Sequence, residues 1–265
     1  MSTEAALSPS EPRLVPAVER AVRLLDALAA ARRPLALTEL ARALALPKSS
    51  VHGLLATLVA LGLARRNADG EFTLGARPLQ WSDAYARQSD VLRAFTEQVD
   101  RQAALRTETV MLAVLDGADV TYLACRPGTR PLAVNFRVGG RFPASCTSSG
   151  KAMLGTLPDA RVRELLAVAG CRRLTRHSVG SVAALLRQLH AGRERGWAID
   201  DEETAEGMQC FGAAVFAARA PEAAAAVAVS VIKAGLGARR RNEVVDGIAA
   251  LAAEMSSALG AAATH

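Results

Sequence analysis

The sequence predicts a two-domain protein of the α+β class, and three observations lead to this prediction. The chain has 265 residues, which is longer than one ordinary domain and enough for two separate cores. Helical periodicity dominates up to about residue 90, and strand-like runs then alternate with helical ones. The composition is 51% hydrophobic but only 4% aromatic, which suits Ala- and Leu-rich helices combined with Val-rich strands.

The chain begins with a polar segment and a first helix. Residues 1–13 contain no apolar run like that of a signal peptide, and we expect a disordered leader there. A helix is predicted over 16–31, because apolar residues recur there at the spacing of one helix face. Pro34 lies beyond its end. The residues expected on its buried face are Val18, Val22, Leu25 and Leu28, with Ala21 and Leu24 beside them.

Two further helices are predicted before residue 62. Thr38 stands where an N-cap is expected, ahead of a short helix that runs through about Leu44. Pro47 opens the third helix, which ends at about Leu61 because Gly62 is typical of the position after a helix. The residues expected on the buried stripe of the third helix are Val51, Leu54, Leu55, Leu58 and Val59.

Residues 63–74 predict a β-hairpin, since two short alternating runs flank a turn rich in Asn, Asp and Gly. Three helices followed by a hairpin is the order of a winged helix-turn-helix, a DNA-binding fold. We expect this domain to span 14–75 and a linker helix to span 76–89.

The third helix and the wing carry the expected DNA contacts. Small and hydroxyl side chains let the N-terminal end of an exposed helix approach phosphates and base edges, and wing arginines can reach phosphates. Without the helix-turn-helix context, such residues would more often be ordinary solvated ones. The predicted DNA-binding residues are Thr38, Lys48, Ser49, Ser50, His52, Gly53, Thr57, Arg65 and Arg66.

Net charge supports a nucleic-acid partner only modestly. The formal charge of +6 is compatible with an anionic partner, because Lys and Arg near phosphates release counterions. Residues 1–75 nevertheless hold nine Lys or Arg against seven Asp or Glu, so the positive excess is not concentrated in the expected DNA-binding domain.

Residues 90–265 are expected to form a second domain with an antiparallel sheet and flanking helices. The predicted strands lie at 110–115, 120–124, 132–136, 197–199, 211–216 and 224–232. The predicted helices lie at 91–99, 151–157, 160–168, 182–193 and 239–259.

Composition also sets aside several classes of protein. Four cysteines lie far apart without a Cys-x-x-Cys pair or a histidine at ligand spacing, so we expect no disulfide, no metal and no cofactor. The longest apolar stretch, 223–232, is too short to span a bilayer. We therefore expect a cytoplasmic protein without a membrane partner.

The segment 145–151 ends in Gly-Lys but does not fit a phosphate-binding P-loop. Ser145 stands in place of the first glycine, and Ala152 follows the lysine instead of Ser or Thr. A simple helix start is one interpretation. We prefer a loop whose hydroxyls and backbone N–H groups accept a polar or anionic ligand at a helix N-terminus.

Several separate motifs, in the right order, resemble the IclR family of transcription regulators. They lie at 17–25, 37–41, 46–52, 69–75, 138–143, 149–152 and 196–203, followed by Gly207 and Cys210. The resemblance implies a winged helix-turn-helix and a C-terminal domain similar to the GAF fold. It also implies homodimers or homotetramers that bind a palindromic operator in double-stranded DNA and respond to a small organic effector, often a carboxylate or an aromatic metabolite.

The resemblance implies a pocket for that effector. Its residues would be Cys146, Ser148, Ser149, Gly150, Asp200, Cys210 and Ser230. Two departures stand out. Gly53 replaces an arginine that is common in the family, and Ser148 and Ser149 stand where many relatives have Gly and Ala, which suggests a tighter or more polar pocket.

Other interpretations of these residues remain open at this point. The acidic run 200–203 would usually be a solvated loop, and a lone cysteine in an apolar strand such as Cys210 is more often part of the core. An alternative function is a small-molecule hydrolase with Cys146 or Ser148 as nucleophile and His177 as base, although no orienting third group is apparent. A winged helix used only for protein contacts is a third possibility. We expect a regulator and not an enzyme.

Overall fold

The computed structural model describes residues 14–129, 136–218 and 220–261. By its internal contacts the chain divides into two compact units, Met1–Ala86 and Arg87–His265. The predicted leader at 1–13 lies outside the described residues.

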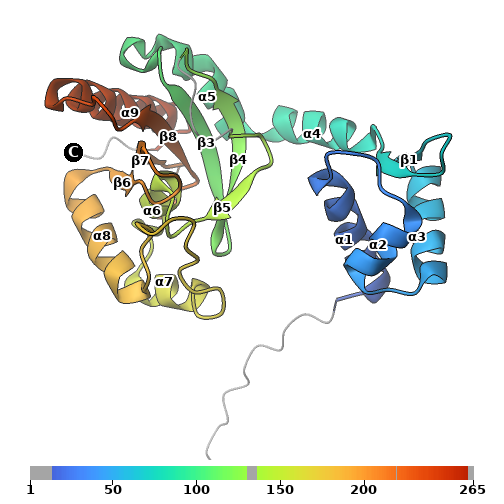
Figure 1. Cartoon of the computed structure of the whole chain (residues 1–265). Helices are drawn as coiled ribbons and strands as arrows, with labels where there is room; N and C mark the ends of the chain where they lie inside the picture. Colours follow the sequence, from blue (N-terminus) through green and yellow to red (C-terminus); the bar gives the residue numbers. More distant parts are fainter. Residues whose placement is uncertain (1–13, 130–135, 219, 262–265) are drawn as a thin grey trace, which may run out of the picture. The chain divides into compact units, whose positions relative to one another are not determined.

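The first unit contains three helices and a hairpin, as predicted (Figure 1). The helices are α1 (Pro16–Ala30), α2 (Leu37–Leu44) and α3 (Lys48–Ala60), and the hairpin strands are β1 (Ala64–Arg66) and β2 (Phe72–Leu74). The strands pair antiparallel, with Ala64 opposite Leu74. A bridge between Leu35 and Phe72 joins the segment before α2 to the wing.

Burial in the first unit corrects the predicted face of α1. Leu24 and Leu28 are buried one turn apart, whereas Val18 and Val22 are 61% and 50% exposed. The helix packs on α2 and β2 along the Leu24 side, which leaves Val18 and Val22 on the opposite side. On α3, Val51, Leu55 and Leu58 are buried as predicted, Leu54 is half-buried and Val59 is exposed.

The predicted cap of α2 is also wrong. Thr38 lies inside the first turn and is exposed, and Ala36 occupies the N-cap position. The Glu39 carboxylate supplies the cap, because its Oε2 accepts the Ala36 N–H at 2.9 Å. Arg33 holds this carboxylate in an ion pair that, together with the Ala36 N–H, lowers the pKa of Glu39 to about 2.

The second unit is built on a six-stranded antiparallel sheet with strand order β5-β4-β3-β8-β7-β6. The strands are β3 (Thr109–Asp116), β4 (Asp119–Arg126), β5 (Arg141–Pro143), β6 (Ala198–Asp201), β7 (Met208–Val215) and β8 (Ala225–Ile232). Five of them were predicted, and β5 was not. The strand predicted at 132–136 falls mostly on 130–135, outside the described residues.

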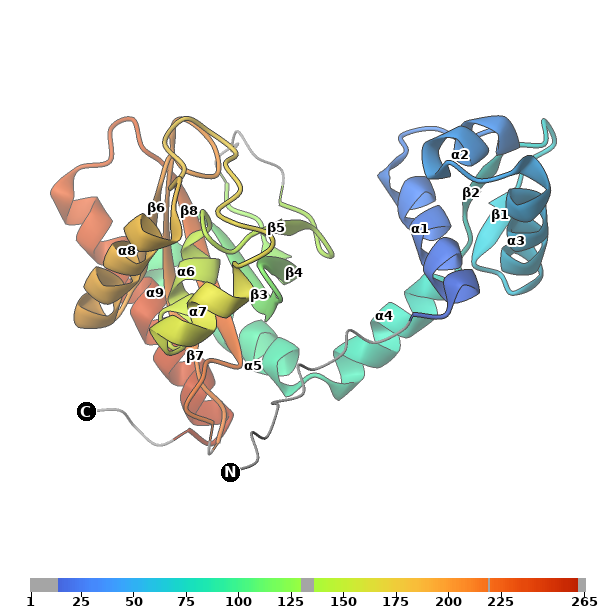
Figure 2. The same cartoon turned by 90° about the horizontal axis from the view of Figure 1, so that it is seen from below.

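Helices cover both faces of this sheet (Figures 1 and 2). One face packs on α5 (Asp90–Gln98) and α9 (Ala238–Ala258), and the other on α6 (Ser148–Leu154), α7 (Asp159–Leu165) and α8 (Val182–Arg195). Helix α4 (Arg77–Gln88) precedes α5. The predicted helix at 160–168 is shorter than expected, since α7 ends at Leu165 and Val168 is fully exposed.

The pattern of β7 shows how the sheet separates two cores. Phe211, Ala213 and Val215 pack on the α9 side, whereas Met208 and Cys210 pack on the α6 side. Strand β8 lies in the interior of the sheet and is apolar almost throughout, as expected for a strand covered on both faces. The α6 side carries the predicted effector residues.

Across the described ranges, no single helix is long and apolar enough to cross a membrane; only α2 and α3 taken together have the required length and composition, and they are bent by 113°. The described residues contain no group of His, Cys, Asp or Glu arranged to hold a metal ion.

Candidate functional site

The predicted DNA-binding residues lie on the surface of the first unit. Lys48, Ser49, His52, Gly53 and Thr57 are exposed on α3, and Ser50 is half-buried. The exposed wing strand β1 carries Arg65 and Arg66, and Thr38 is exposed in the first turn of α2. This surface thus combines small and hydroxyl side chains on α3 with positively charged side chains at Lys48, Arg65 and Arg66.

Three of these residues, Thr57, Gly53 and Arg66, have local features that sequence could not show. Thr57 Oγ1 donates to the Gly53 carbonyl at 3.0 Å, so its proton is already used within the helix. A Cβ on Gly53 would meet nothing within 4 Å, so packing does not require glycine there. The Arg66 guanidinium lies 5.7 Å from the centre of the Phe72 ring, which holds it against the wing.

In the second unit, strand register places a row of polar side chains across the sheet. Asp200 pairs with Cys210, Cys210 with Ser230, and Ser230 with Thr109, on four neighbouring strands. Directly opposed residues in antiparallel strands share one face. All four are buried, and Cys210 Sγ lies 3.1 Å from Ser230 Oγ. The register thus brings together three of the predicted effector residues.

Helix α6 packs directly on this part of the sheet. Gly212 of β7 lies so close to the Ser148 backbone that a Cβ would sit 2.5 Å from its carbonyl oxygen. Gly150 lies equally close to Ala144, with a Cβ position 2.3 Å from the Ala144 oxygen. Gly150 is therefore a packing residue. It allows the start of α6 to lie against the preceding loop.

The prediction that residues 146–150 form a loop is wrong in part. Residues 148–150 already form the first turn of α6, and Thr147 caps it by accepting the Gly150 N–H at 3.1 Å. Ser149 is completely buried, and its Oγ forms no hydrogen bond of good geometry among the described residues, although the Tyr122 phenol lies near enough to interact with it. An unpartnered buried hydroxyl is costly unless something else bonds to it.

Aromatic rings lie next to Ser149. Tyr122 is buried beside it, and its ring centre lies 5.4 Å from those of both Phe136 and Phe142. Burial raises the pKa of the Tyr122 phenol, which stays protonated. The site therefore combines hydroxyl and thiol groups with an aromatic wall.

Asp200 is a buried carboxyl group at one end of the polar row. Its Oδ1 accepts the backbone N–H groups of Glu203 and Thr204 at 2.7 and 3.1 Å. Thr204 Oγ1 donates to the Cys146 carbonyl at 3.3 Å, which links Cys146 to the same loop. Burial raises the pKa of Asp200 to about 6, so both its protonation states are accessible near neutral pH.

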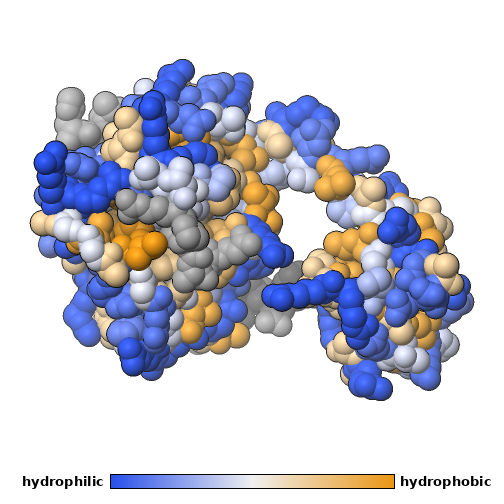
Figure 3. Space-filling view, turned by 45° about the horizontal axis from the view of Figure 1, so that its top comes forward, coloured by the Kyte–Doolittle hydropathy of each residue, from blue (hydrophilic) through white to orange (hydrophobic). Residues whose placement is uncertain are grey.

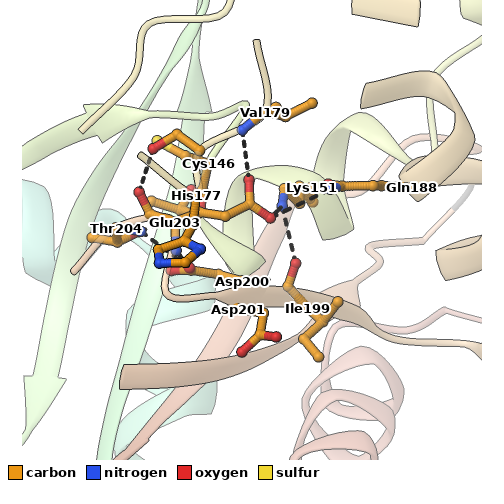
Figure 4. Close-up of polar contacts among 12 residues, drawn as sticks. Cys146, Lys151, His177, Val179, Gln188, Ile199, Asp200, Asp201, Glu203 and Thr204 are labelled. Atoms are coloured by element: carbon orange, nitrogen blue, oxygen red, sulfur yellow. Dashed lines mark hydrogen bonds and ion pairs between the residues drawn. The ribbon is translucent and has the colours of Figure 1, made fainter. Parts of the chain in front are cut away.

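An ion pair between Lys151 and Glu203 anchors this cluster (Figure 4). Both side chains are almost completely buried, and Lys151 Nζ also donates to the Ile199 carbonyl at 3.1 Å. Glu203 Oε2 accepts the Val179 N–H at 3.1 Å. The pair ties α6 to the loop after β6 and to the segment before α8.

Lys151 and Glu203 are absent from the predicted site residues, whereas Asp200 is one of them. The lysine follows Gly150 in an otherwise apolar helix, which is the one local signal of its burial. The run 200–203 is not a solvated loop, because Asp200 and Glu203 are buried. The other two acidic residues of the run, Asp201 and Glu202, form ion pairs with the partly exposed Lys233. In Figure 4 the Asp201 side chain points to the side of β6 opposite Asp200.

The groups proposed for hydrolysis do not form a catalytic pair. Burial raises the pKa of the Cys146 thiol to about 12, so it carries little thiolate. His177 is exposed, and its Nε2 accepts from Arg176 Nε at 3.1 Å. Ser148 is buried within the first turn of α6. Among the described residues, no hydrogen bond joins either nucleophile to this histidine.

Asp200→Asn is expected to change the pH dependence of stability. The folded state raises the pKa of Asp200 from 3.8 to about 6, so ionisation opposes folding and wild-type stability falls as pH rises through this window. Relative to wild type, the variant should therefore gain about 3 kcal/mol in free energy of unfolding between about pH 4 and pH 8.

Urea unfolding at several pH values, followed by Trp197 emission, measures this gain. Asp201→Asn, at the half-exposed neighbouring position, serves as the control and should show no comparable gain with pH. A constant difference between wild type and Asp200→Asn across the range would contradict a raised pKa of this buried carboxyl group.

A winged helix-turn-helix that precedes an antiparallel α+β domain with a buried polar cluster defines a two-domain, DNA-binding transcription regulator. The family model for the bacterial transcriptional regulator IclR C-terminal domain matches residues 83–257, and the model for the IclR helix-turn-helix domain matches 17–68. The chain belongs to the IclR family of transcriptional regulators.

Individual relatives agree with this assignment. The chain is 31% identical to the HTH-type transcriptional regulator KdgR of Dickeya chrysanthemi over 214 residues, which cover 78% of this chain and 68% of KdgR. It is 30% identical to the transcriptional repressor IclR of Escherichia coli over 208 residues, covering 76% and 75% of the two chains. These relatives are named regulators, and the protein is a regulator and not an enzyme.

Solved structures share the fold. The Agobacterium tumefaciens repressor BlcR matches with 36% identity and a TM-score of 0.62, covering 94% of this chain and 99% of BlcR. An IclR homologue from Microbacterium hydrocarbonoxydans, solved in complex with 4-hydroxybenzoate, matches with 22% identity and a TM-score of 0.76, covering 93% and 100%. The two-domain α+β prediction is confirmed.

Proposed function

We propose that the protein is a cytoplasmic regulator that binds a palindromic operator as a homodimer or homotetramer and responds to a small carboxylate or aromatic metabolite. The observation that carries the effector proposal is the buried polar row from Asp200 to Ser230, with the buried hydroxyl of Ser149 above the sheet. Residues 14–75 would bind DNA, 76–89 would link the domains, and 90–265 would bind the effector.

The chemistry of the cluster favours an effector with a carboxylate or a ring. Ser149 and one member of the bonded pair Cys210 and Ser230 offer donors to an anionic oxygen, and protonated Asp200 can donate as well. The rings of Tyr122 and its neighbours form an apolar wall. The complex of one IclR homologue with 4-hydroxybenzoate, which carries both groups, supports this class by analogy.

Apolar residues on the surface of the first unit support a homodimer. Helix α1 and the residues before it expose Leu14, Val15, Val18 and Val22, and α4 exposes Leu79, Trp81 and Tyr85. Figure 3 shows hydrophobic residues on this unit among hydrophilic ones. Several large exposed apolar side chains along one stretch of the surface are typical of a protein interface. A second copy that covers them would place two recognition helices on one operator.

Removal of three cations tests DNA binding. The triple variant Lys48→Ala, Arg65→Ala and Arg66→Ala should bind the DNA upstream of its own gene at least ~100-fold more weakly and lower the slope of log affinity against log salt by about 3. The reason is that each lost phosphate contact releases one counterion fewer. Fluorescence anisotropy at several salt concentrations measures both.

A control variant with the same change in charge is Arg163→Ala, Arg173→Ala and Arg187→Ala, at exposed positions of the second unit. It should retain most of the affinity and the slope. Equal losses in both triple variants would mean that net charge, and not the helix and wing, determines binding.

A further inference from the structure

The second unit contains a pocket that none of the predicted effector residues lines. It has a volume of about 800 Å³ and lies between α6, the end of α8 and the far end of β7. Volumes of several hundred cubic ångströms are usual for pockets that hold small organic molecules. Nothing in the proposed effector site accounts for it.

The walls of this pocket are apolar and fixed. Trp197 and Phe216 supply aromatic surface, and Gly155, Gly192 and Gly196 leave the space between them open. The Trp197 and Phe211 rings pack edge to face with their centres 5.5 Å apart, and the Arg195 guanidinium lies 4.7 Å from the centre of the Trp197 ring. These contacts hold the indole in place.

The edge of the sheet contributes a peptide group to the pocket. Strand β6 begins at Ala198, opposite Gly212, and the Glu202 N–H donates to the Met208 carbonyl. In an antiparallel pair, alternate residues direct both N–H and C=O to the same neighbour. Met208 therefore directs its peptide groups toward β6, and so does every second residue after it, up to Ala214. Strand β6 begins opposite Gly212, so the N–H and C=O of Ala214 point into the space beyond Ala198, where Ala214 lines the pocket.

Charge decides which ligand this pocket suits. Among the described lining residues the cations are Lys151 and Arg193. Lys151 is neutralised by Glu203, and Arg193 bonds to Asp159 at 3.1 Å and to the carbonyls of Gly155 and Leu157 at 2.6 and 2.7 Å. Because both lining cations are already paired and the Arg195 guanidinium against Trp197 is exposed to water, a carboxylate would lose its hydration without gaining a buried partner.

We propose that this pocket is a second ligand site, which binds a neutral aromatic or alicyclic molecule carrying one hydroxyl or amide group. The ring would pack on Trp197 and Phe216, and the polar group would bond to the Ala214 peptide. Lys151 belongs to both sites, since the residue lines the pocket and its ammonium group holds the buried cluster.

The test uses the full-length protein with Trp81→Phe, which leaves Trp197 as the sole tryptophan. Benzyl alcohol, benzamide and cyclohexanol are the neutral probes, and benzoate and cyclohexanecarboxylate are the charged ones. At least one neutral probe should change Trp197 emission saturably, at least ~10-fold more tightly than its carboxylate counterpart.

Two variants locate the binding. Gly192→Leu places a side chain in the pocket where a Cβ has only ordinary contacts, and it should weaken binding at least ~10-fold; Ala217→Leu fills the opposite wall and is used if the first variant does not fold. Ala183→Leu, on the exposed side of the same helix, should leave binding unchanged.

Ser149→Ala separates this site from the buried cluster, and it should retain binding of the neutral probe. Three results would overturn the proposal: no saturable change with any neutral probe, equal affinity for the carboxylates, or binding that the filled pocket does not weaken. None of these results would depend on whether the protein binds its operator.

Discussion

Lys151→Met is expected to lower the free energy of unfolding of the C-terminal domain by about 3–5 kcal/mol. Methionine has a similar volume, so the loss does not come from a cavity. It arises because Glu203 keeps a buried charge without its cation, and the remaining Val179 N–H and Gln188 contacts cannot compensate for it. Urea unfolding followed by Trp197 emission, in the Trp81→Phe background, measures the change.

The double variant Lys151→Met with Glu203→Leu should recover more than half of this loss, because replacing a whole buried ion pair by apolar residues is often nearly neutral. Arg161→Met, which breaks the exposed pair with Glu164, should change stability by less than about 1 kcal/mol. If the single and double variants are equally unstable, the lysine contributes by packing and not by neutralising Glu203.

Gly150→Ala should destabilise the same domain by about 3 kcal/mol, at the upper end of what overpacking usually costs. The added Cβ would lie 2.3 Å from the Ala144 oxygen and 2.4 Å from its Cα, and both are backbone atoms that cannot rotate away. The start of α6 must shift, which moves Ser149 relative to the polar row. The variant should therefore also lose its response to the effector.

Gly180→Ala is the matched control for this substitution. A Cβ there meets nothing within 4 Å, so the variant should unfold at nearly the wild-type urea concentration. If Gly150→Ala is as stable as Gly180→Ala, the close packing of α6 against the Ala144 loop is not a property of the folded protein.

Local patterns in the sequence predict most helices and strands of this fold. Helical spacing locates α1 to α3, and a turn rich in Asn, Asp and Gly locates the wing between Arg66 and Phe72. Helical spacing does not predict which face of α1 is buried. Val18 and Leu24 both fit helical spacing, and only the position of α2 and β2 decides which one is buried.

The candidate site depends on contacts between distant segments. Asp200, Cys210 and Ser230 meet because of strand register, and a family resemblance, not their spacing, suggested them. The Lys151–Glu203 pair joins residues 52 positions apart, so no local pattern could reveal that these charges are buried together. The apolar pocket beside Trp197 was missed for the same reason, since several separate segments line it.

The most direct test of the central claim is binding of the full-length protein to the DNA upstream of its own gene. Binding is measured at two salt concentrations, with and without a panel of small carboxylates and aromatic compounds. We predict specific, salt-sensitive binding whose affinity one compound shifts, and a weaker shift in Ser149→Val. Absence of specific binding under all conditions, or binding that no compound changes, would contradict a ligand-responsive, DNA-binding regulator.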